Sequence, residues 1–82
     1  MKKTYTINLS GKIFHIDEDA LEKLQEYINT LKTYYTQEED GNEIMDDIEN
    51  RIGELFTENL KGQFREVITL DDVDQVIATM GT

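Results

Sequence analysis

The chain has 82 residues, contains no cysteine and carries a formal net charge of −10 at pH 7. This length supports one small domain, residues 1–82, whose single core must form without disulfide bonds or thiolate metal ligands. No apolar run approaches the ~20 residues that span a bilayer, and the start of the chain lacks a signal-peptide pattern, so the chain as given is expected to be soluble.

The charge is distributed unevenly. Residues 1–16 contain three lysines and no acid, whereas residues 17–82 contain eighteen acids and five bases. An acidic surface of this kind disfavours sequence-independent binding to nucleic acid, which requires Lys and Arg to neutralise phosphates. It also disfavours adsorption to an anionic membrane. The basic start can pair with the acidic remainder, within or between chains, or both can simply be solvated.

Two strands are predicted at the start of the chain. Residues 4–9 alternate between apolar and polar side chains, residues 10–11 are Ser-Gly, and residues 12–16 alternate again. This pattern is typical of a β-hairpin with a two-residue turn. The register that matches the apolar faces pairs Leu9 with Lys12, Ile7 with Phe14 and Tyr5 with Ile16.

A helix is expected over residues 18–35, where apolar residues recur at spacings of three and four after the acidic residues 17–19. Its apolar stripe is about 140° wide. Residues 36–42, TQEEDGN, are polar and predict a loop between two helices. The oxygen-rich loop lacks the ligand spacing of a calcium-binding loop, so a solvated loop is the better interpretation.

The strongest helical pattern covers residues 43–60, and its apolar side chains occupy an arc of about 160°. Because one neighbour needs only about 100°, we expect this helix to pack against both the first helix and the sheet. Gly53 lies at the margin of the arc and marks either a close approach by another backbone or a tolerated surface glycine. Residues 61–62, Lys-Gly, are a suitable end for the helix.

The last part of the chain predicts a short strand and a short helix. Residues 66–69 hold a brief β-branched run, Thr69 and Asp72 have the spacing of a capping box, and Gly81 follows the last apolar position. The fold class is therefore α+β, with order β-β-α-α-β-α: a three-stranded sheet covered on one face by an αα-hairpin and a short C-terminal helix. The predicted core comprises Tyr5, Ile7, Leu9, Phe14, Ile16, Leu21, Leu24, Ile28, Leu31, Ile44, Ile48, Ile52, Leu55, Phe56, Val67, Val73 and Ile77.

No residue set predicts catalysis. Ser10 and His15 are the only residues of their types, and the geometry of a hairpin keeps them from meeting as nucleophile and base. His15 has no evident partners for a metal site, and no glycine-rich phosphate loop is present. We therefore expect a non-enzymatic chain without cofactor or metal.

An interaction surface is the remaining interpretation. The candidate residues are the helix acids Glu43, Asp46, Asp47 and Glu54, with Ile13 and His15 on the outer face of the hairpin. Homodimerisation through Ile13 and the edge strands is a further possibility. A small DNA-binding or antitoxin-like regulator is the alternative from another class, although the acids at the start of the last helix disfavour a recognition helix. A metal-dependent hydrolase that uses surface carboxylates is the least favoured hypothesis.

Three segments carry a family resemblance: TYTINLSGKIFHIDEDA (4–20), EIMDDIENRIGELF (43–56) and VITLDDVDQVIATMG (67–81). They resemble the N-terminal region of bacterial phage-shock-protein-C (PspC) domain proteins, which belong to envelope-stress systems. The resemblance implies a regulatory domain that binds protein partners at the cytoplasmic face of the inner membrane. The hydrophobic PspC segment is not in this chain. The resemblance therefore also implies that this domain belongs to a longer membrane protein and is attached to the membrane only through that segment.

Overall fold

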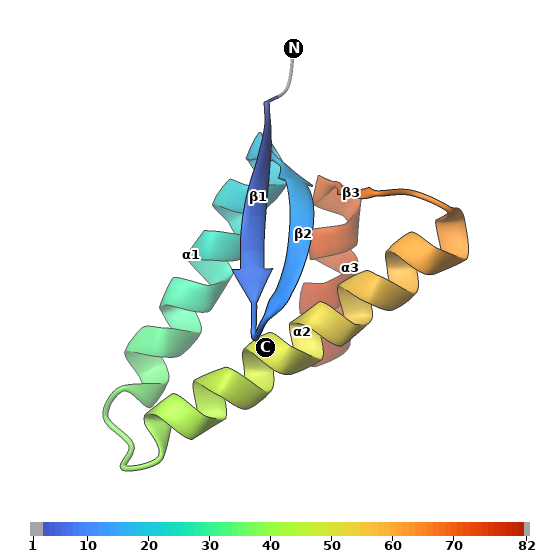
Figure 1. The fold of residues 1–82 in the computed structure, drawn as a ribbon. Coiled ribbons are helices and arrows are strands. Elements are labelled where there is room, and N and C mark those ends of the chain that lie inside the picture. Colours follow the sequence, from blue (N-terminus) through green and yellow to red (C-terminus); the bar gives the residue numbers. More distant parts are fainter. Residues whose placement is uncertain (1–2, 82) are drawn as a thin grey trace.

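The N-terminal hairpin lies on the front of the molecule and the helices cover its back (Figure 1). The computed structural model describes residues 3–81. Its elements, in chain order, are β1 (Thr4–Leu9), β2 (Lys12–Asp17), α1 (Glu18–Tyr35), α2 (Gly41–Gln63), β3 (Val67–Ile68) and α3 (Leu70–Met80). The sheet has the order β1-β2-β3, with β1 antiparallel and β3 parallel to β2. The predicted α+β class and element order are confirmed.

The hairpin has the predicted register, with Ile7 opposite Phe14 and Tyr5 opposite Ile16. Ser10 and Gly11 both have positive φ, 50° and 87°, as a two-residue turn between twisted strands requires. The Asn8 side chain accepts a hydrogen bond of 2.8 Å from the Gly11 N–H and so stabilises the turn. The second strand extends one residue further than predicted, to Asp17.

The first helix occupies the predicted residues and is tied to the sheet at its first residue. The Glu18 N–H donates to the Lys3 carbonyl over 2.9 Å, so the residue before β1 satisfies a backbone group that a capping side chain would otherwise take. At the other end, the loop is shorter than predicted, because residues 41–42 already belong to α2. A Cβ at buried Gly41 would lie 2.2 Å from the Tyr35 carbonyl oxygen, so only glycine permits this close approach of the two helices.

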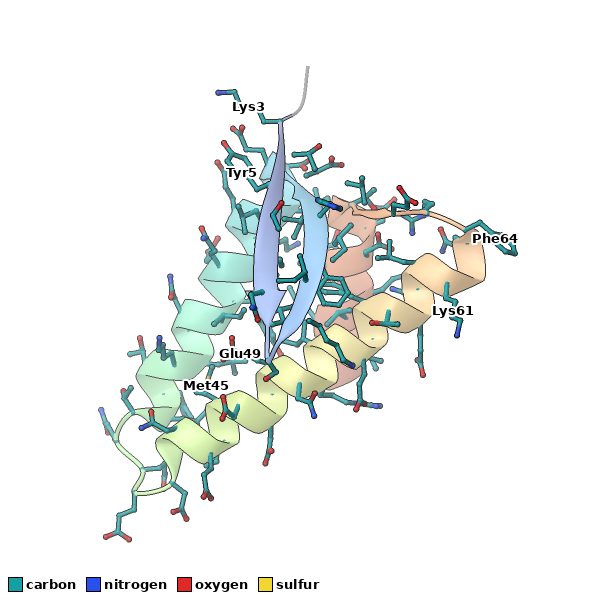
Figure 2. All side chains as sticks on the ribbon, viewed as in Figure 1. Lys3, Tyr5, Met45, Glu49, Lys61 and Phe64 are labelled. Carbon is teal, nitrogen blue, oxygen red and sulfur yellow. The ribbon has the colours of Figure 1, made fainter. Side chains whose placement is uncertain are left out.

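Helix α2 also ends later than predicted. Gly62 stays helical, and Phe64 takes the left-handed conformation, with φ 54°, that the sequence led us to expect of a glycine. The N–H groups of Phe64 and Arg65 both donate to the Leu60 carbonyl, which closes the helix. The Phe64 side chain is 96% exposed and projects into solvent at the far end of α2 (Figure 2).

The segment after α2 is held by a partly buried ion pair. Arg65 donates two hydrogen bonds to the Asp72 carboxylate, at 2.9 and 2.6 Å, and the Thr69 N–H adds one at 2.9 Å. The predicted capping box at Thr69 and Asp72 is therefore confirmed, and the sequence did not reveal that Arg65 joins it. Burial raises the pKa of Asp72, but the hydrogen bonds from Arg65 and Thr69 outweigh it and hold the pKa below its usual value.

Helix α2 spans the molecule beneath the hairpin turn and packs against more elements than predicted. Besides α1 and the sheet it contacts α3, which lies behind the hairpin and also packs on α1 (Figure 1). Gly53 is buried, and a Cβ there would lie 3.6–3.8 Å from the side chains of Lys12, Phe14 and Leu9. Both interpretations of Gly53 were therefore wrong, because hairpin side chains, rather than a backbone, approach it.

The core lies between the sheet and the three helices. Its centre includes Phe14 and Phe56, whose rings meet edge to face with centroids 5.8 Å apart. Of the predicted core residues, Tyr5 is wrong: it is 40% exposed because β1 lies at the edge of the sheet. Leu31, Ile44 and Val67 are only partly buried and lie outside the core cluster. Four buried apolar residues were missed, namely Ala20, Met45, Ile68 and Val76.

Candidate functional site

The predicted helix acids are all exposed on α2, and three of the four share one face. Glu43, Asp47 and Glu54 share the face of α2 that points away from the core. Asp46 lies to the side, where its carbonyl accepts a hydrogen bond of 3.4 Å from the Ser10 hydroxyl in the hairpin turn. Glu54 also faces Arg51 at 3.5 Å, in an exposed ion pair of little energetic weight.

Ile13 and His15 lie on a different surface from the helix acids. Both belong to the outer face of β2, where Ile13 is 60% exposed and His15 Nδ1 lies 3.4 Å from the Thr6 hydroxyl. The helices cover the other face of the sheet (Figure 1). The structure therefore divides the six predicted residues between α2 and the outer face of the sheet.

A groove that the sequence did not predict lies between α1 and α3. It has a volume of about 650 Å³, and its walls are mainly apolar. The apolar and aromatic lining residues are Tyr27, Leu31, Tyr34, Tyr35 and Ile77. Lys23, Glu26 and Thr30 form its polar margin. All but Ile77 belong to α1, so the groove follows this helix along its C-terminal two thirds.

The tyrosines of this groove differ in how firmly they are held. The Tyr27 hydroxyl donates to the Gly81 carbonyl over 3.5 Å, and burial raises the pKa of Tyr27, with Tyr35 adding to the effect. The Tyr34 and Tyr35 rings pack edge to face, with centroids 5.0 Å apart. Tyr34 is nevertheless 71% exposed, so a large aromatic surface faces solvent at one end of the groove.

An ion pair joins the two helices beside the groove. The Lys23 ammonium contacts the Asp74 carboxylate, and both side chains are about half exposed. The positive charge of Lys23, at the margin of the groove, is therefore already balanced by Asp74. Glu26, at the same margin, is an exposed acid whose backbone carbonyl accepts from the Thr30 hydroxyl at 2.9 Å. The charge left on this margin is therefore negative.

The length of the first apolar stripe was the signal that could have revealed the groove. The stripe continues to Tyr34 and Tyr35, whereas its width of about 140° is already used by α2, α3 and the sheet, which all pack on α1. The core covers Ala20 and Leu24 completely, whereas Leu31 and Tyr35, near the end of α1, remain partly exposed. Because α3 is short, it leaves this end of α1 partly uncovered. Only the tertiary structure shows how much of the apolar surface of α1 stays exposed.

Within residues 3–81, no group of three or more His, Cys, Asp or Glu side chains is placed to hold a metal ion. In the same part of the chain, no helix combines the length and apolarity that crossing a membrane requires. Comparisons with protein-family models, with curated proteins and with solved structures gave no match. The surface geometry itself is therefore the basis for a functional proposal.

Proposed function

We propose that this chain is a non-catalytic, regulatory protein-interaction domain whose groove between α1 and α3 binds an amphipathic helix of a partner protein. The apolar groove is the observation that carries the proposal. It joins Tyr27, Leu31 and Tyr34 of α1 to Ile77 of α3, and Tyr34 offers the exposed aromatic surface that often dominates protein interfaces.

A helix suits the length of the groove. The lining residues of α1 run from Lys23 to Tyr35, which corresponds to about 18 Å along the helix axis. A partner helix laid along this length places apolar anchors at positions i, i+3, i+4 and i+7 against the groove, which is a common mode of peptide recognition.

Charge selects the partner further. The chain has a net charge of −10, the margin of the groove carries Glu26, and Lys23 is already paired with Asp74. Basic residues beside the apolar stripe of the partner would therefore be favoured, and they would also speed association. The same acidity disfavours nucleic acid as the partner.

The resemblance to PspC-domain proteins supports a regulatory role in an envelope-stress system. Under this proposal the domain lies at the cytoplasmic face of the inner membrane and is joined to a membrane segment outside this chain. The coding sequence downstream of residue 82 tests that part: an apolar segment of about 20 residues is expected. A reading frame that ends without one would contradict the membrane location and leave the groove proposal standing.

The groove is tested with a model peptide. The probe is a blocked helix of Leu and Lys, with Leu at i, i+3, i+4 and i+7, and the control peptide has the same composition in scrambled order. Fluorescence anisotropy should show binding of the patterned peptide only. Tyr34→Ala should weaken this binding about tenfold or more, because it removes an aromatic anchor.

Phe64→Ala is the matched control variant, since Phe64 is equally aromatic and even more exposed but lies outside the groove. It should bind the patterned peptide as the unaltered protein does. Equal losses in both variants, or equal binding of both peptides, would contradict the groove as the site. Specific binding of duplex DNA at ~150 mM salt would favour the DNA-binding alternative instead.

A further inference from the structure

The free edge of β1 is a second surface of the molecule with unused binding groups. Within residues 3–81 the only strand next to β1 is β2. Because the ladder starts at the Leu9–Lys12 pair beside the turn, alternate residues of β1 bond to β2 and the others face outward. The outward residues are Thr4, Thr6 and Asn8, which are all exposed. Their backbone N–H and C=O groups are available to a further strand.

This edge lacks the features that usually prevent strands from pairing. Residues 4–9, TYTINL, contain no charge and no proline, although 32% of the chain is charged. The register runs without a bulge from the Thr4–Asp17 pair to the Leu9–Lys12 pair. Sheet proteins commonly protect their edges with charges, prolines or bulges. An unprotected edge in so charged a chain is therefore suited to binding a strand.

The helix side of the edge selects which strand binds. Tyr5 is 40% exposed there, and its hydroxyl donates to the Glu18 carboxylate over 3.4 Å. The negative charge of Glu18, and to a smaller extent that of Glu22, raises the pKa of Tyr5. Glu22 follows Glu18 by one helical turn on α1, so the two carboxylates lie on the same side of this helix. A side chain of an added strand that points to this side meets an aromatic ring and two carboxylates. Lys and Arg satisfy both kinds of contact.

The Lys3 side chain does not occupy this place. It extends away from the sheet beyond the end of β1, whereas Tyr5 lies on the side of α1 (Figure 2). The Lys3 carbonyl is already used by the Glu18 N–H at 2.9 Å. Within residues 3–81, Glu18 and Glu22 form no ion pair, so their carboxylates can face a cation from another molecule.

A second copy of this chain is poorly suited to the edge. Helix α1 passes behind the free edge of β1 and leans out beyond it (Figure 1). A two-fold axis that pairs β1 with its own copy would place the second α1 behind the same edge, where the two helices would compete for room. Both copies would also carry a net charge of −10. An extended segment without a helix of its own avoids both conflicts.

We propose that the free edge of β1 binds an extended segment of a partner protein that has Lys or Arg at alternate positions. The segment adds a fourth strand to the sheet through the backbone of Thr4, Thr6 and Asn8, and its basic side chains face Tyr5, Glu18 and Glu22. Main-chain hydrogen bonds supply affinity and the alternating side chains supply specificity. This proposal is independent of the groove, which lies on a different part of α1.

The test uses blocked peptides and amide hydrogen exchange. The probe is acetyl-Thr-Lys-Thr-Val-Thr-Lys-amide, and the control peptide has Glu in place of each Lys. The Lys peptide should slow exchange at the Thr4, Thr6 and Asn8 amides, whereas the Glu peptide should not. Equal effects of the two peptides, or no effect of either, would overturn the proposal.

Two variants locate the binding on the edge. Thr6→Pro removes an outward N–H, where an edge strand tolerates proline, and should weaken binding of the Lys peptide about tenfold. Ile13→Thr, on the outer face of β2, is the matched control and should leave binding unchanged. Binding to Thr6→Pro as tight as to the unaltered protein would overturn the proposal.

Charge reversal supplies a second readout that does not depend on the stability of Thr6→Pro. Glu22→Lys should weaken the Lys peptide and give measurable binding of the Glu peptide, because Glu22 lies on the exposed side of α1. Unchanged preference in this variant would overturn the assigned charge contact. Sedimentation that shows a dimer abolished by Thr6→Pro would assign the edge to a second copy and overturn the proposed partner.

Discussion

The two ends of α3 are built in opposite ways. At its start, Asp72 is buried and bonds to Arg65 and Thr69, so its carboxylate has several partners. At its other end, Ile77 borders an open groove with the exposed ring of Tyr34. A buried charge that is fully paired determines position, whereas apolar surface left uncovered provides a place for binding. Changes at the first end should alter stability, and changes at the second should alter binding.

The largest effect on stability is expected in the core, because both ends of α3 pack against it. Phe56 is fully buried and contacts Phe14, and it belongs to the helix against which the sheet, α1 and α3 pack. Phe56→Asp buries an unpaired charge and should cost more than about 4 kcal/mol, enough to unfold a domain of this size. Circular dichroism should show loss of the cooperative thermal transition. An unchanged transition would contradict the central role of α2.

A smaller but still large effect is expected at the start of α3. Asp72→Ala removes both the capping box and the partner of Arg65, and should lower the free energy of unfolding by about 2–4 kcal/mol in urea titrations. The Arg65 side chain is 30% exposed, so water can partly solvate its guanidinium group after the loss of Asp72. Asp74→Ala, which removes the exposed pair with Lys23, is the control and should cost less than about 1 kcal/mol. Equal losses of stability in the two variants would mean that burial does not make the Asp72 pair more stabilising than the exposed Asp74 pair.

The ion pair at the start of α3 should also depend on pH. Since the pKa of Asp72 is lower in the folded than in the unfolded state, its stabilising effect is present above the unfolded value of about 3.9 and is lost as the pH falls below it. The difference in unfolding free energy between the unaltered protein and Asp72→Asn should therefore shrink as the pH falls from 7 to about 3. Taking this difference removes the contribution of the other carboxylates. A constant difference would contradict the assignment.

The smallest effect on stability is expected at the groove. Tyr34 is 71% exposed, so Tyr34→Ala should change the unfolding free energy by less than about 0.5 kcal/mol in the same titrations. Its loss should instead appear in binding of the patterned Leu–Lys peptide. A large loss of stability would place Tyr34 with the structural residues and remove the contrast between the ends of α3.

Local patterns predicted the parts of the fold that local forces determine. The hairpin register follows from the alternation of apolar residues and the Ser10–Gly11 turn, and α1 has its predicted bounds. The capping box at Thr69 was also visible, because it depends on residues three positions apart. The ends of α2 were not predicted, since Gly41 starts it through contact with Tyr35 and Phe64 ends it in a conformation usual for glycine.

The candidate sites were less visible in the sequence than the fold. The six predicted surface residues are exposed, but they lie on two separate surfaces, and the groove residues were interpreted as core or as ordinary helix positions. Tyr5 was likewise expected in the core because its strand alternates correctly. Whether an apolar residue is covered depends on the neighbour that the strand or helix receives, and a local pattern does not contain that information.

By itself, the sequence determined the order of the elements, the hairpin register and the acidic character of the surface. These follow from spacing, turn residues and charge, which act over a few positions. Only the tertiary structure decided that β3 lies parallel to β2, that Arg65 reaches Asp72 and that α3 leaves part of α1 uncovered. Each of these joins residues brought together by packing, and the surfaces proposed to bind partners lie where that packing is incomplete.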